Sequence, residues 1–237
     1  MSLPVAILAG GLATRLRPLT ERIPKILLDV AGRPFAEHQI ELLRKNGIEK
    51  AVLCVGYLGE QVQAALGDGR RFGMRLEYVS DWPRLLGTGG ALRQALPFLG
   101  DAFFVLYGDS YLPCEFAPVE AAFRAAGKAG LMTLFCNTDR WDSSNVVFER
   151  GRILRYDKQH RVPQMKHIDY GLGVLSRRAL ERYPPGAPLD LATVDQDLLA
   201  ADDLAGYEVK ERFYEIGSPE GLEELSVLLS GSQGKAP

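Results

Sequence analysis

The sequence predicts an α/β protein with a mostly parallel central sheet and helices on both faces of that sheet. Short apolar runs of strand length alternate with helix-like segments four or five times in the first half of the chain. Several runs are apolar throughout, which is typical of parallel strands that are buried on both faces. The 237 residues are 46% hydrophobic and 24% charged, ordinary globular proportions for a chain that can bury one substantial core. We therefore expect one domain over residues 1–230 and a disordered tail at 231–237.

The strands expected in the first half are short. The first of them covers Val5–Leu8 and is followed by the adjacent glycines Gly10 and Gly11. Further strands or extended segments are expected at 26–30, 48–55, 75–79, 102–107 and 131–135. Between them, helices are expected from Pro34 to Gly47, at 61–66, at 87–96 and from Pro118 onward.

The second half changes rhythm after residue 136. Apolar runs at 146–148 and 153–156 flank Glu149-Arg150-Gly151, which predicts a hairpin. A strand with internal glycines is expected at 167–175, a helix at 189–199 and a short strand at 213–217. Ser218 and Pro219 are a cap and first residue for a last helix. We expect residues 137–217 to add an antiparallel flap to the parallel sheet formed by residues 1–136.

Composition excludes several classes of partner. The net charge is −2, whereas a non-specific nucleic-acid binder carries a basic surplus, so no nucleic-acid partner is expected. No apolar segment approaches the ~20 residues of a membrane span, and no signal peptide is recognised at the N-terminus. The three cysteines are widely spaced and form no C-x-x-C pair. We expect Cys54 to be a thiol buried in the core. The expected location of the protein is a reducing cytoplasm.

The stretch from Val5 to Lys25 carries the strongest functional signal. Two adjacent glycines follow the first strand, and a loop then carries Arg15, Arg17, Arg22 and Lys25 against a single acid, Glu21. Backbone amides near glycine, together with guanidinium and ammonium groups, make a site for a polyanion such as a triphosphate. The alternative is a glycine turn with surface arginines, since strand-to-helix turns often need glycine.

Two later features favour the same edge of the sheet. Gly87-Thr88-Gly89-Gly90 opens a helix, where glycine permits either close approach of a ligand or close packing of the helix. Asp109 is the first acid after the apolar run 102–107, and open α/β sheets keep their chemistry at the carboxyl ends of such strands. A turn aspartate is the competing interpretation.

The residues exclude a serine or cysteine relay and fit phosphoryl chemistry. There is no G-x-S-x-G and no H-E-x-x-H, and His38, His160 and His167 are the only histidines. Reaction between two phosphates needs alignment and charge neutralisation. Asp109 and Glu215, each at the end of an expected strand, could ligate Mg²⁺, and Arg15 and Lys25 could neutralise phosphate.

The string Leu8–Leu16, followed by Pro24-Lys25, resembles the signature of sugar-1-phosphate nucleotidyltransferases, and the resemblance extends to about Glu220. It implies a three-layer α/β/α Rossmann-like fold, an antiparallel sugar-binding flap and Mg²⁺ as cofactor. It also implies an NTP and a sugar 1-phosphate as substrates, with pyrophosphate released. Residues 1–136 would then bind the nucleotide, and residues 137–217 the sugar phosphate.

The resemblance assigns roles residue by residue. Arg15, Lys25 and Asp109 would be catalytic, and Asp109 and Glu215 would bind the metal. The nucleotide would contact Leu8, Ala9, Gly10, Gly11, Thr14, Arg15, Gly87, Thr88 and Gly89. The sugar phosphate would contact Asn145, Asp157, Lys158 and Gly171. For His167 and Asp169, a sugar-hydroxyl role and simple alternation on one strand face both stay open.

Three positions depart from the family pattern. Ala13 stands where many members have glycine, so we expect a negative φ there. Glu215 replaces a frequent aspartate, and Gln159 a frequent proline after the acid–lysine pair.

Within the family, the chain is most similar to bacterial heptose- or mannose-1-phosphate guanylyltransferases, which makes GTP with heptose or mannose 1-phosphate the first expectation. Uridylyl-, cytidylyl- or thymidylyltransferases, including the muramate type, are the alternative. A transferase acting on a non-sugar phosphate, a glycosyltransferase and a non-catalytic nucleotide-sensing homologue also compete. A glycosyltransferase typically shows Asp-x-Asp where this chain has Asp109-Ser110-Tyr111. Whether the protein is a homo-oligomer is left open.

Overall fold

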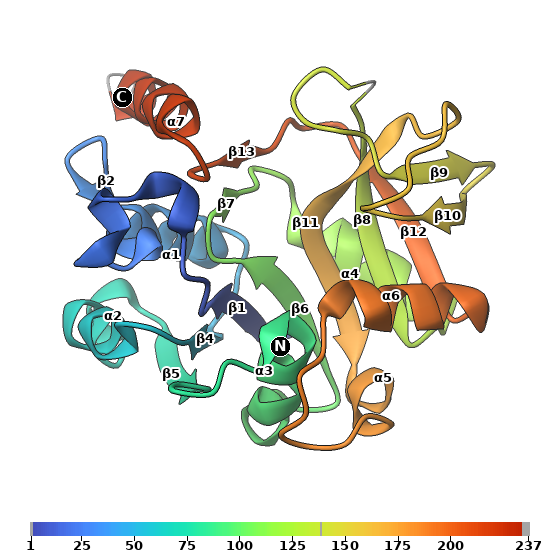
Figure 1. Ribbon diagram of the computed structural model, residues 1–237, viewed down its shortest axis with the longest axis horizontal. Coiled ribbons are helices and arrows are strands. Elements are labelled where there is room, and N and C mark those ends of the chain that lie inside the picture. The colour runs from blue at the N-terminus through green and yellow to red at the C-terminus, as the bar shows by residue number, and fades with distance from the viewer. Residues whose placement is uncertain (1, 138, 234–237) are drawn as a thin grey trace.

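In the computed structural model, which describes residues 2–137 and 139–233, a single large sheet runs through the molecule (Figure 1). Its parallel part has the strand order β5-β4-β1-β6. These strands are β1 (Val5–Ala9), β4 (Lys50–Val55), β5 (Arg75–Ser80) and β6 (Ala102–Tyr107). Because the four strands are parallel, their carboxyl ends lie along one edge of the sheet.

The rest of the sheet is organised around one long strand, β11 (His167–Ser176). β11 runs antiparallel to β6 on one side and to β8 (Gly130–Cys136) on the other, and β12 (Leu204–Val209) lies parallel to β8. The register of β11 shifts between Asp169 and Gly173. Beyond that shift, the start of β11 pairs with a hairpin formed by β9 (Val146–Glu149) and β10 (Arg152–Tyr156). The expected mostly parallel sheet with an antiparallel hairpin is therefore confirmed.

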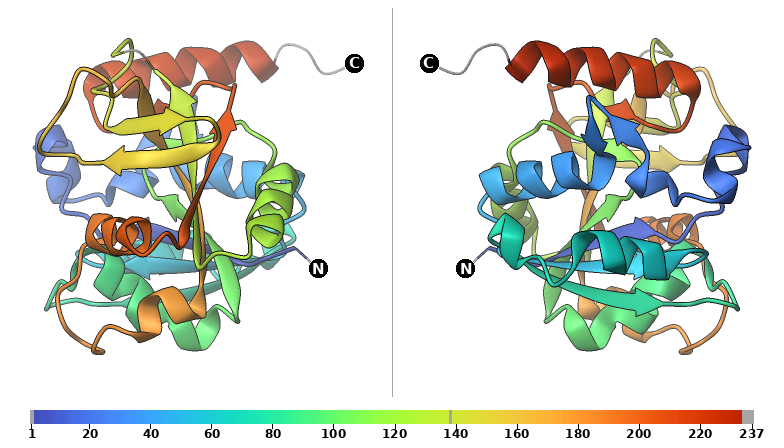
Figure 2. Two further views of the ribbon diagram at one scale, coloured as in Figure 1. Left: turned by 90° about the vertical axis from the view of Figure 1, so that its right-hand side faces the viewer. Right: turned by 90° about the vertical axis from the view of Figure 1, so that its left-hand side faces the viewer.

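Helices cover both faces of the sheet and complete three layers (Figure 2). One face packs against α1 (Phe35–Lys45), α2 (Gly59–Leu66), α4 (Phe116–Ala126) and α7 (Pro219–Gln233). The other packs against α3 (Gly87–Ala95), α5 (Arg177–Glu181) and α6 (Leu191–Ala200). Strand β1 contributes to the hydrophobic core on each face. Val5 and Ile7 pack on the face covered by α1, and Ala6 packs on the face covered by α3, because successive side chains of a strand point to opposite faces. No helix within residues 2–137 and 139–233 is long and apolar enough to cross a membrane.

Several elements differ from the sequence-based expectation. Segment 26–30 is not one strand: a 3₁₀ turn, Lys25–Leu27, precedes β2 (Asp29–Val30), which pairs with β3 (Arg33–Pro34). Helix α4 begins at Phe116, ahead of Pro118. Strand β12 was not expected, because Gly206 interrupts its short apolar run. In the structure Gly206 packs closely, since a Cβ on it would lie 2.7 Å from the Phe148 ring. Helix α7 continues to Gln233, so residues 231–233 of the expected tail are helical, and residues 234–237 lie outside the described part.

The small remaining elements connect or extend these. Short 3₁₀ turns occur at Thr14–Leu16, Leu19–Glu21, Arg70–Phe72 and Leu96–Phe98. A separate two-stranded pair joins β7 (Ser110–Tyr111) to β13 (Tyr214–Glu215).

The ends of β1 and β4 approach each other closely through glycine. A Cβ on Gly56 would lie 2.6 Å from the carbonyl oxygen of Gly10, closer than real Cβ contacts allow. We predict that Gly56→Ala lowers the free energy of unfolding by about 1–3 kcal/mol, because backbone must move to admit the methyl group. Denaturant unfolding measures the change.

Gly231→Ala is the matched control. Gly231 lies in α7 with nothing within 4 Å of its added Cβ. Alanine should raise the free energy of unfolding there by up to about 1 kcal/mol, since it favours helix. Equal stability of Gly56→Ala and the wild type would contradict the close approach.

Candidate active site

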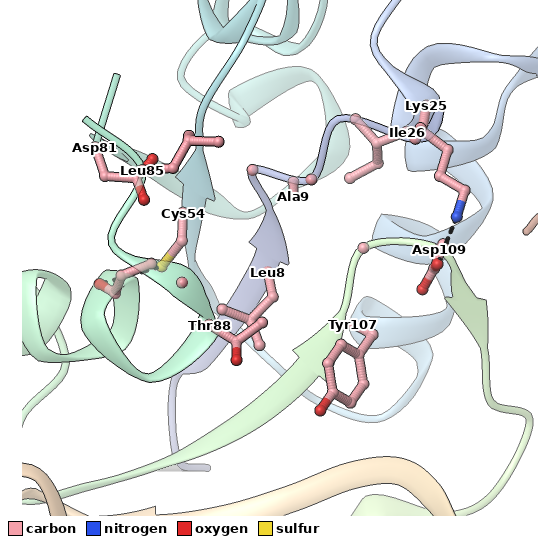
Figure 3. A pocket seen from close by; sticks show the side chains of 16 residues that line it. Leu8, Ala9, Lys25, Ile26, Cys54, Asp81, Leu85, Thr88, Tyr107 and Asp109 are labelled. Carbon is pink, nitrogen blue, oxygen red and sulfur yellow. Dashed lines mark hydrogen bonds and ion pairs between the residues drawn. The ribbon is translucent and has the colours of Figure 1, made fainter. Parts of the chain in front are cut away.

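A cavity of about 290 Å³, called the main cavity below, opens at the carboxyl ends of β1 and β6 (Figure 3). Six of the nine residues expected to bind nucleotide line it: Leu8, Ala9, Gly10, Gly11, Gly87 and Thr88. Lys25 and Asp109 line it as well. The edge of the sheet predicted from the sequence is therefore hollowed, and residues far apart in the chain meet there.

Lys25 and Asp109 form the closest charged contact of this cavity. The Lys25 Nζ lies 2.6 Å from Asp109 Oδ2, and Figure 3 shows both side chains at the same wall. The side chains are 18% and 30% exposed, so the pair is partly desolvated yet open to a ligand. The expectation that the two groups share one cleft is met by this contact.

The backbone that carries Asp109 is fixed by a buried amide. Gln39, fully buried in α1, donates from Nε2 to the carbonyl oxygens of Tyr107 at 3.0 Å and Ser110 at 2.9 Å. The N–H of Ile216 donates to the carbonyl of Asp109 at 2.9 Å. Gln39 is a positioning residue that the sequence analysis did not name. Its one signal was a polar amide on the helix face that also carries Ala36, Ile40 and Leu43.

Glu215 stands beside this pair because β13 lies next to β7. Glu215 pairs with Ser110 across the two strands. A Cβ built on Gly217 would lie 3.5 Å from Glu215 Oε1 and 3.7 Å from Lys25 Nζ. The Glu215 carboxylate and the Lys25 ammonium therefore both lie close to Gly217. Burial raises the pKa of Glu215, Asp109 and Asp142 add to that rise, and Lys25 and Arg15 oppose it.

Asp109 and Glu215 suit a divalent cation. Their carboxylates are hard oxygen donors close to each other. After burial, the negative charge of Asp109 is the next cause that raises the pKa of Glu215. A bound cation would offset this repulsion between the two carboxylates. Lys25 is the ammonium beside them. The residues therefore fit Mg²⁺, with Glu215 in place of the more frequent aspartate.

The basic loop folds against a second cavity of about 220 Å³, called the side cavity. Thr14, Arg15, Leu16 and Gly217 line it, and it shares Ala13 and Lys25 with the main cavity. Lys25 thus stands where the two cavities join. Arg15 and Thr14, which were expected to touch the nucleotide, face the side cavity.

The expectation for Ala13 was wrong. Its φ is +47°, in the left-handed region, whereas a negative φ was expected. The carbonyl of Ala13 accepts hydrogen bonds from Leu16 N–H at 3.1 Å and Thr20 Oγ1 at 2.8 Å. These contacts hold the turn in a shape that costs an alanine ~1–2 kcal/mol, so the loop overrides the residue's own preference.

The second glycine cluster serves packing as much as binding. Gly89 does not line the main cavity; a Cβ on it would lie 2.8 Å from Leu189 Cγ. Thr88 does line the cavity, but its hydroxyl donates to Asp190 Oδ1 at 3.2 Å and accepts from Leu191 N–H at 2.9 Å. The close-packing interpretation therefore fits Gly89, and Thr88 ties α3 to the start of α6.

Asp81 is a lining residue that the sequence analysis did not single out. Its Oδ2 accepts from Leu86 N–H at 2.8 Å, while its Oδ1 is buried and has no hydrogen-bond partner within the described residues. No sequence signal marked it. Cys54 lines the same wall, and burial, helped by Asp81, raises the pKa of its thiol to about 12, so it stays protonated.

Three of the four expected sugar-phosphate residues gather around Asp169. The Asp169 N–H donates to Asn145 Oδ1 at 2.9 Å, and Gly171 N–H donates to Asp169 Oδ1 at 3.1 Å. Lys158 Nζ lies 3.5 Å from Asp169 Oδ2. The Asp157 carboxylate instead accepts from backbone N–H groups of its own loop.

His167 lies apart from Asp169 in its contacts. Its Nε2 is 3.2 Å from Glu208 Oε1, and its ring packs edge-on against Phe148. Ligand-type atoms of Cys136, His167 and Glu208 lie within 4.8 Å of one another, outside the main cavity. His167 therefore contacts Glu208 and Phe148, whereas Asp169 contacts three of the expected sugar-phosphate residues; neither contact set decides between alternation and a sugar-hydroxyl role.

The fold and the site define an α/β protein with a charged cavity at the carboxyl edge of its sheet. The glycine loop lines this cavity, Lys25 contacts Asp109 there, and Glu215 lies beside them. Residues 5–162 match the nucleotidyl transferase family. The chain belongs to that family.

Two curated relatives and one solved structure illustrate the similarity. The chain is 30% identical to the mannose-1-phosphate guanylyltransferase catalytic subunit beta of Xenopus tropicalis, over 98% of this chain and 66% of that protein. It is 40% identical to the N-acetylmuramate alpha-1-phosphate uridylyltransferase of Neisseria meningitidis, over 51% of each. HddC of Yersinia pseudotuberculosis, solved with GMP-PN, has a TM-score of 0.81 at 22% identity, covering 96% of this chain and all of that one, which shows the fold.

The chain thus spans about half to two thirds of the length of these curated relatives.

The Asp157 loop gives a prediction about pH. Backbone N–H groups of His160 and Gln159 hold the pKa of Asp157 at about 2, below its ordinary 3.8. Its contribution to stability is therefore present above the ordinary pKa and is lost as the pH falls through about 2. We predict that the stability difference between the wild type and Asp157→Asn is constant above pH ~5 and shrinks below pH ~4. Urea unfolding measures it, and a carboxyl NMR midpoint near 3.8 would contradict the loop geometry.

Proposed function

We propose that the protein transfers a nucleotidyl group from an NTP to a sugar 1-phosphate and releases pyrophosphate. The observation that carries the proposal is the Lys25–Asp109 contact, with Glu215 beside it, at the wall of a cavity lined by the glycine loop. Family membership and the sugar-1-phosphate transferases among the relatives support it.

The two halves of the chain divide the substrates. Residues 1–136 hold the nucleoside triphosphate, with base and ribose in the main cavity and the outer phosphates toward Arg15 and Thr14 in the side cavity. Residues 137–217 hold the sugar phosphate around Asp169. Lys25 stands between the cavities, where the α-phosphate reacts.

The reaction needs no general base. A phosphate monoester has a second pKa near 6, so a sugar 1-phosphate is largely ionised at neutral pH. Its oxygen attacks the α-phosphorus of the NTP, and the bond from that phosphorus to the pyrophosphate oxygen breaks. The protein's task is to hold the two anions in line and to neutralise their charge. Lys25 and Arg15 supply the positive charge.

Asp109 and Glu215 would hold Mg²⁺, which when bound supplies Lewis-acid stabilisation of phosphate oxygens. Gln39 and Ile216 hold the backbone at Asp109, which sets the direction from which its side chain enters the site. Glutamate at position 215 reaches the same place from β13.

Asp81 supports GTP as the nucleotide. Asp81 lines the main cavity and its carboxylate is an acceptor, so a fitting base brings hydrogen-bond donors. Guanine offers an N–H and an amino group side by side, which one carboxylate can accept together. Uracil and thymine offer one N–H between two carbonyls. Heptose or mannose 1-phosphate remains the proposed acceptor, with a uridylyl transfer of the muramate type as the alternative.

The protein is proposed to work in the cytoplasm without a nucleic-acid or membrane partner, in keeping with its net charge of −2.

We predict that Lys25→Ala and Asp109→Ala each lower kcat/KM by about 10²–10³-fold, because each removes charge stabilisation at the reacting phosphate. Pyrophosphate release with Mg²⁺, each common NTP and a panel of sugar 1-phosphates measures the effect. Lys45→Ala and Asp68→Ala, both exposed and outside the cavity, are the controls and should keep wild-type rates. Near-normal turnover of either site variant would reject that residue's assignment.

A separate prediction concerns the base. Asp81→Asn turns one buried acceptor into a donor, so the preference for GTP over UTP in kcat/KM should fall at least about ten-fold. The KM for the sugar 1-phosphate should stay the same. An unchanged base preference would show that Asp81 does not read the base.

A further inference from the structure

A small cavity of about 20 Å³ lies next to the main cavity, beneath the residues that gather around Asp169. It is bounded by β6, β11 and α6, and Tyr107 lines both cavities. About 10–15 Å³ is enough for one water molecule, so this space fits one small polar group. Its polar walls come from Tyr107, Asp169, Gly171 and Asp195.

Asp195 enters this space from α6 without a partner. It is 8% exposed, and no hydrogen bond or ion pair is formed by its carboxyl group within the described residues. Its carboxyl oxygens are therefore available to a ligand group that enters this cavity. Asp195 is therefore an unexplained acid aimed into a cavity beside the reacting centre.

Asp169 is the second acid of the same cavity, and unlike Asp195 it has hydrogen-bond donors and a lysine beside it. Its side chain, 11% exposed, accepts from Gly171 N–H at 3.1 Å and from the Tyr156 hydroxyl at 3.3 Å. Lys158 Nζ lies 3.5 Å from its Oδ2. With a cation and two donors, Asp169 is an acceptor group.

Burial, and then the negative charge of Asp169, raise the pKa of Asp195 well above its ordinary value, although Lys158 opposes this. This shift favours the protonated form of Asp195, whose O–H can donate a hydrogen bond. The two acids thus present one donor and one acceptor to the same small space.

We propose that Asp195 and Asp169 together bind a single hydroxyl group of the sugar 1-phosphate, Asp195 donating to its oxygen and Asp169 accepting its hydrogen. The inference rests on the proposed function and names the substrate feature that the site selects. The favoured acceptors are sugar 1-phosphates with a free hydroxyl at the position that enters the cavity.

Other substituents match the pair less well. An N-acetyl group is too large for a space of about 20 Å³. A deoxy position leaves Asp195 without a partner, and sites built to bind a hydroxyl reject such analogues strongly.

The experiment compares Asp195→Leu and Asp195→Asn with the wild type. Because Asp195 has no partner to lose, Asp195→Leu should unfold at a temperature no lower than the wild type. Its KM for the sugar 1-phosphate should rise at least about ten-fold, with the KM for the NTP unchanged. The asparagine amide still donates, so Asp195→Asn should keep most of the wild-type affinity.

Monodeoxy and N-acetyl analogues locate the hydroxyl. For one position on the ring, the kcat/KM of the wild type should be about 100-fold or more higher for the hydroxyl compound than for its deoxy analogue. For Asp195→Leu, the same ratio should be less than about ten-fold. Asp197→Asn is the matched control, because Asp197 lies exposed on the same helix and bonds Tyr183. It should behave as the wild type does.

The failures are distinguishable. A KM for sugar 1-phosphate within two-fold of the wild type in Asp195→Leu, or equal discrimination against every deoxy analogue, would leave the nucleotidyl transfer standing and overturn this inference in favour of a buried water. If Asp195→Leu does not fold, Asp195→Ala replaces it under the same criteria. A wild-type protein that forms no nucleotide sugar with any pair removes both proposals at once.

Discussion

The contact between the Lys25 ammonium and the Asp109 carboxylate is the interaction around which the rest of the site is arranged. The two groups come together because β1 and β6 are parallel neighbours, so the loop after β1 returns beside the end of β6. With side chains 18% and 30% exposed, such a pair contributes little to stability. Its value is therefore the placement of opposite charges at the wall of a cavity.

The acids are held more firmly than the bases. Backbone contacts fix Asp109 through Gln39 and Ile216, and Glu215 is fixed by the pairing of β13 with β7. Arg15 sits on a loop built from short 3₁₀ turns. The proposed cation site is therefore built on paired strand ends, and the proposed phosphate contacts on a loop.

The sequence predicted those parts of the site that follow from strand ends. Asp109 follows an uninterrupted apolar run and Lys25 a glycine loop, so both could be placed at one edge of a parallel sheet. Gln39, Asp81 and Asp195 could not be found this way, because a polar residue within a helix or loop carries no sign of what it contacts. Hydrogen bonds within the loop accompany the positive φ of Ala13, which the preference of alanine alone assigns wrongly.

Environment divides the acids of this cleft into two kinds. Asp109 has a lysine at 2.6 Å, and Asp169 has a lysine at 3.5 Å with two further donors, so both are placed as hydrogen-bond acceptors. Asp195 is buried next to Asp169 with no cation of its own, which favours its protonated form. The same residue type is therefore an acceptor beside a lysine at two places in the cleft and, in our proposal, a hydrogen-bond donor at a third. Because Thr88 joins α3 to α6, the helix that carries Asp195 is anchored to the wall of the main cavity.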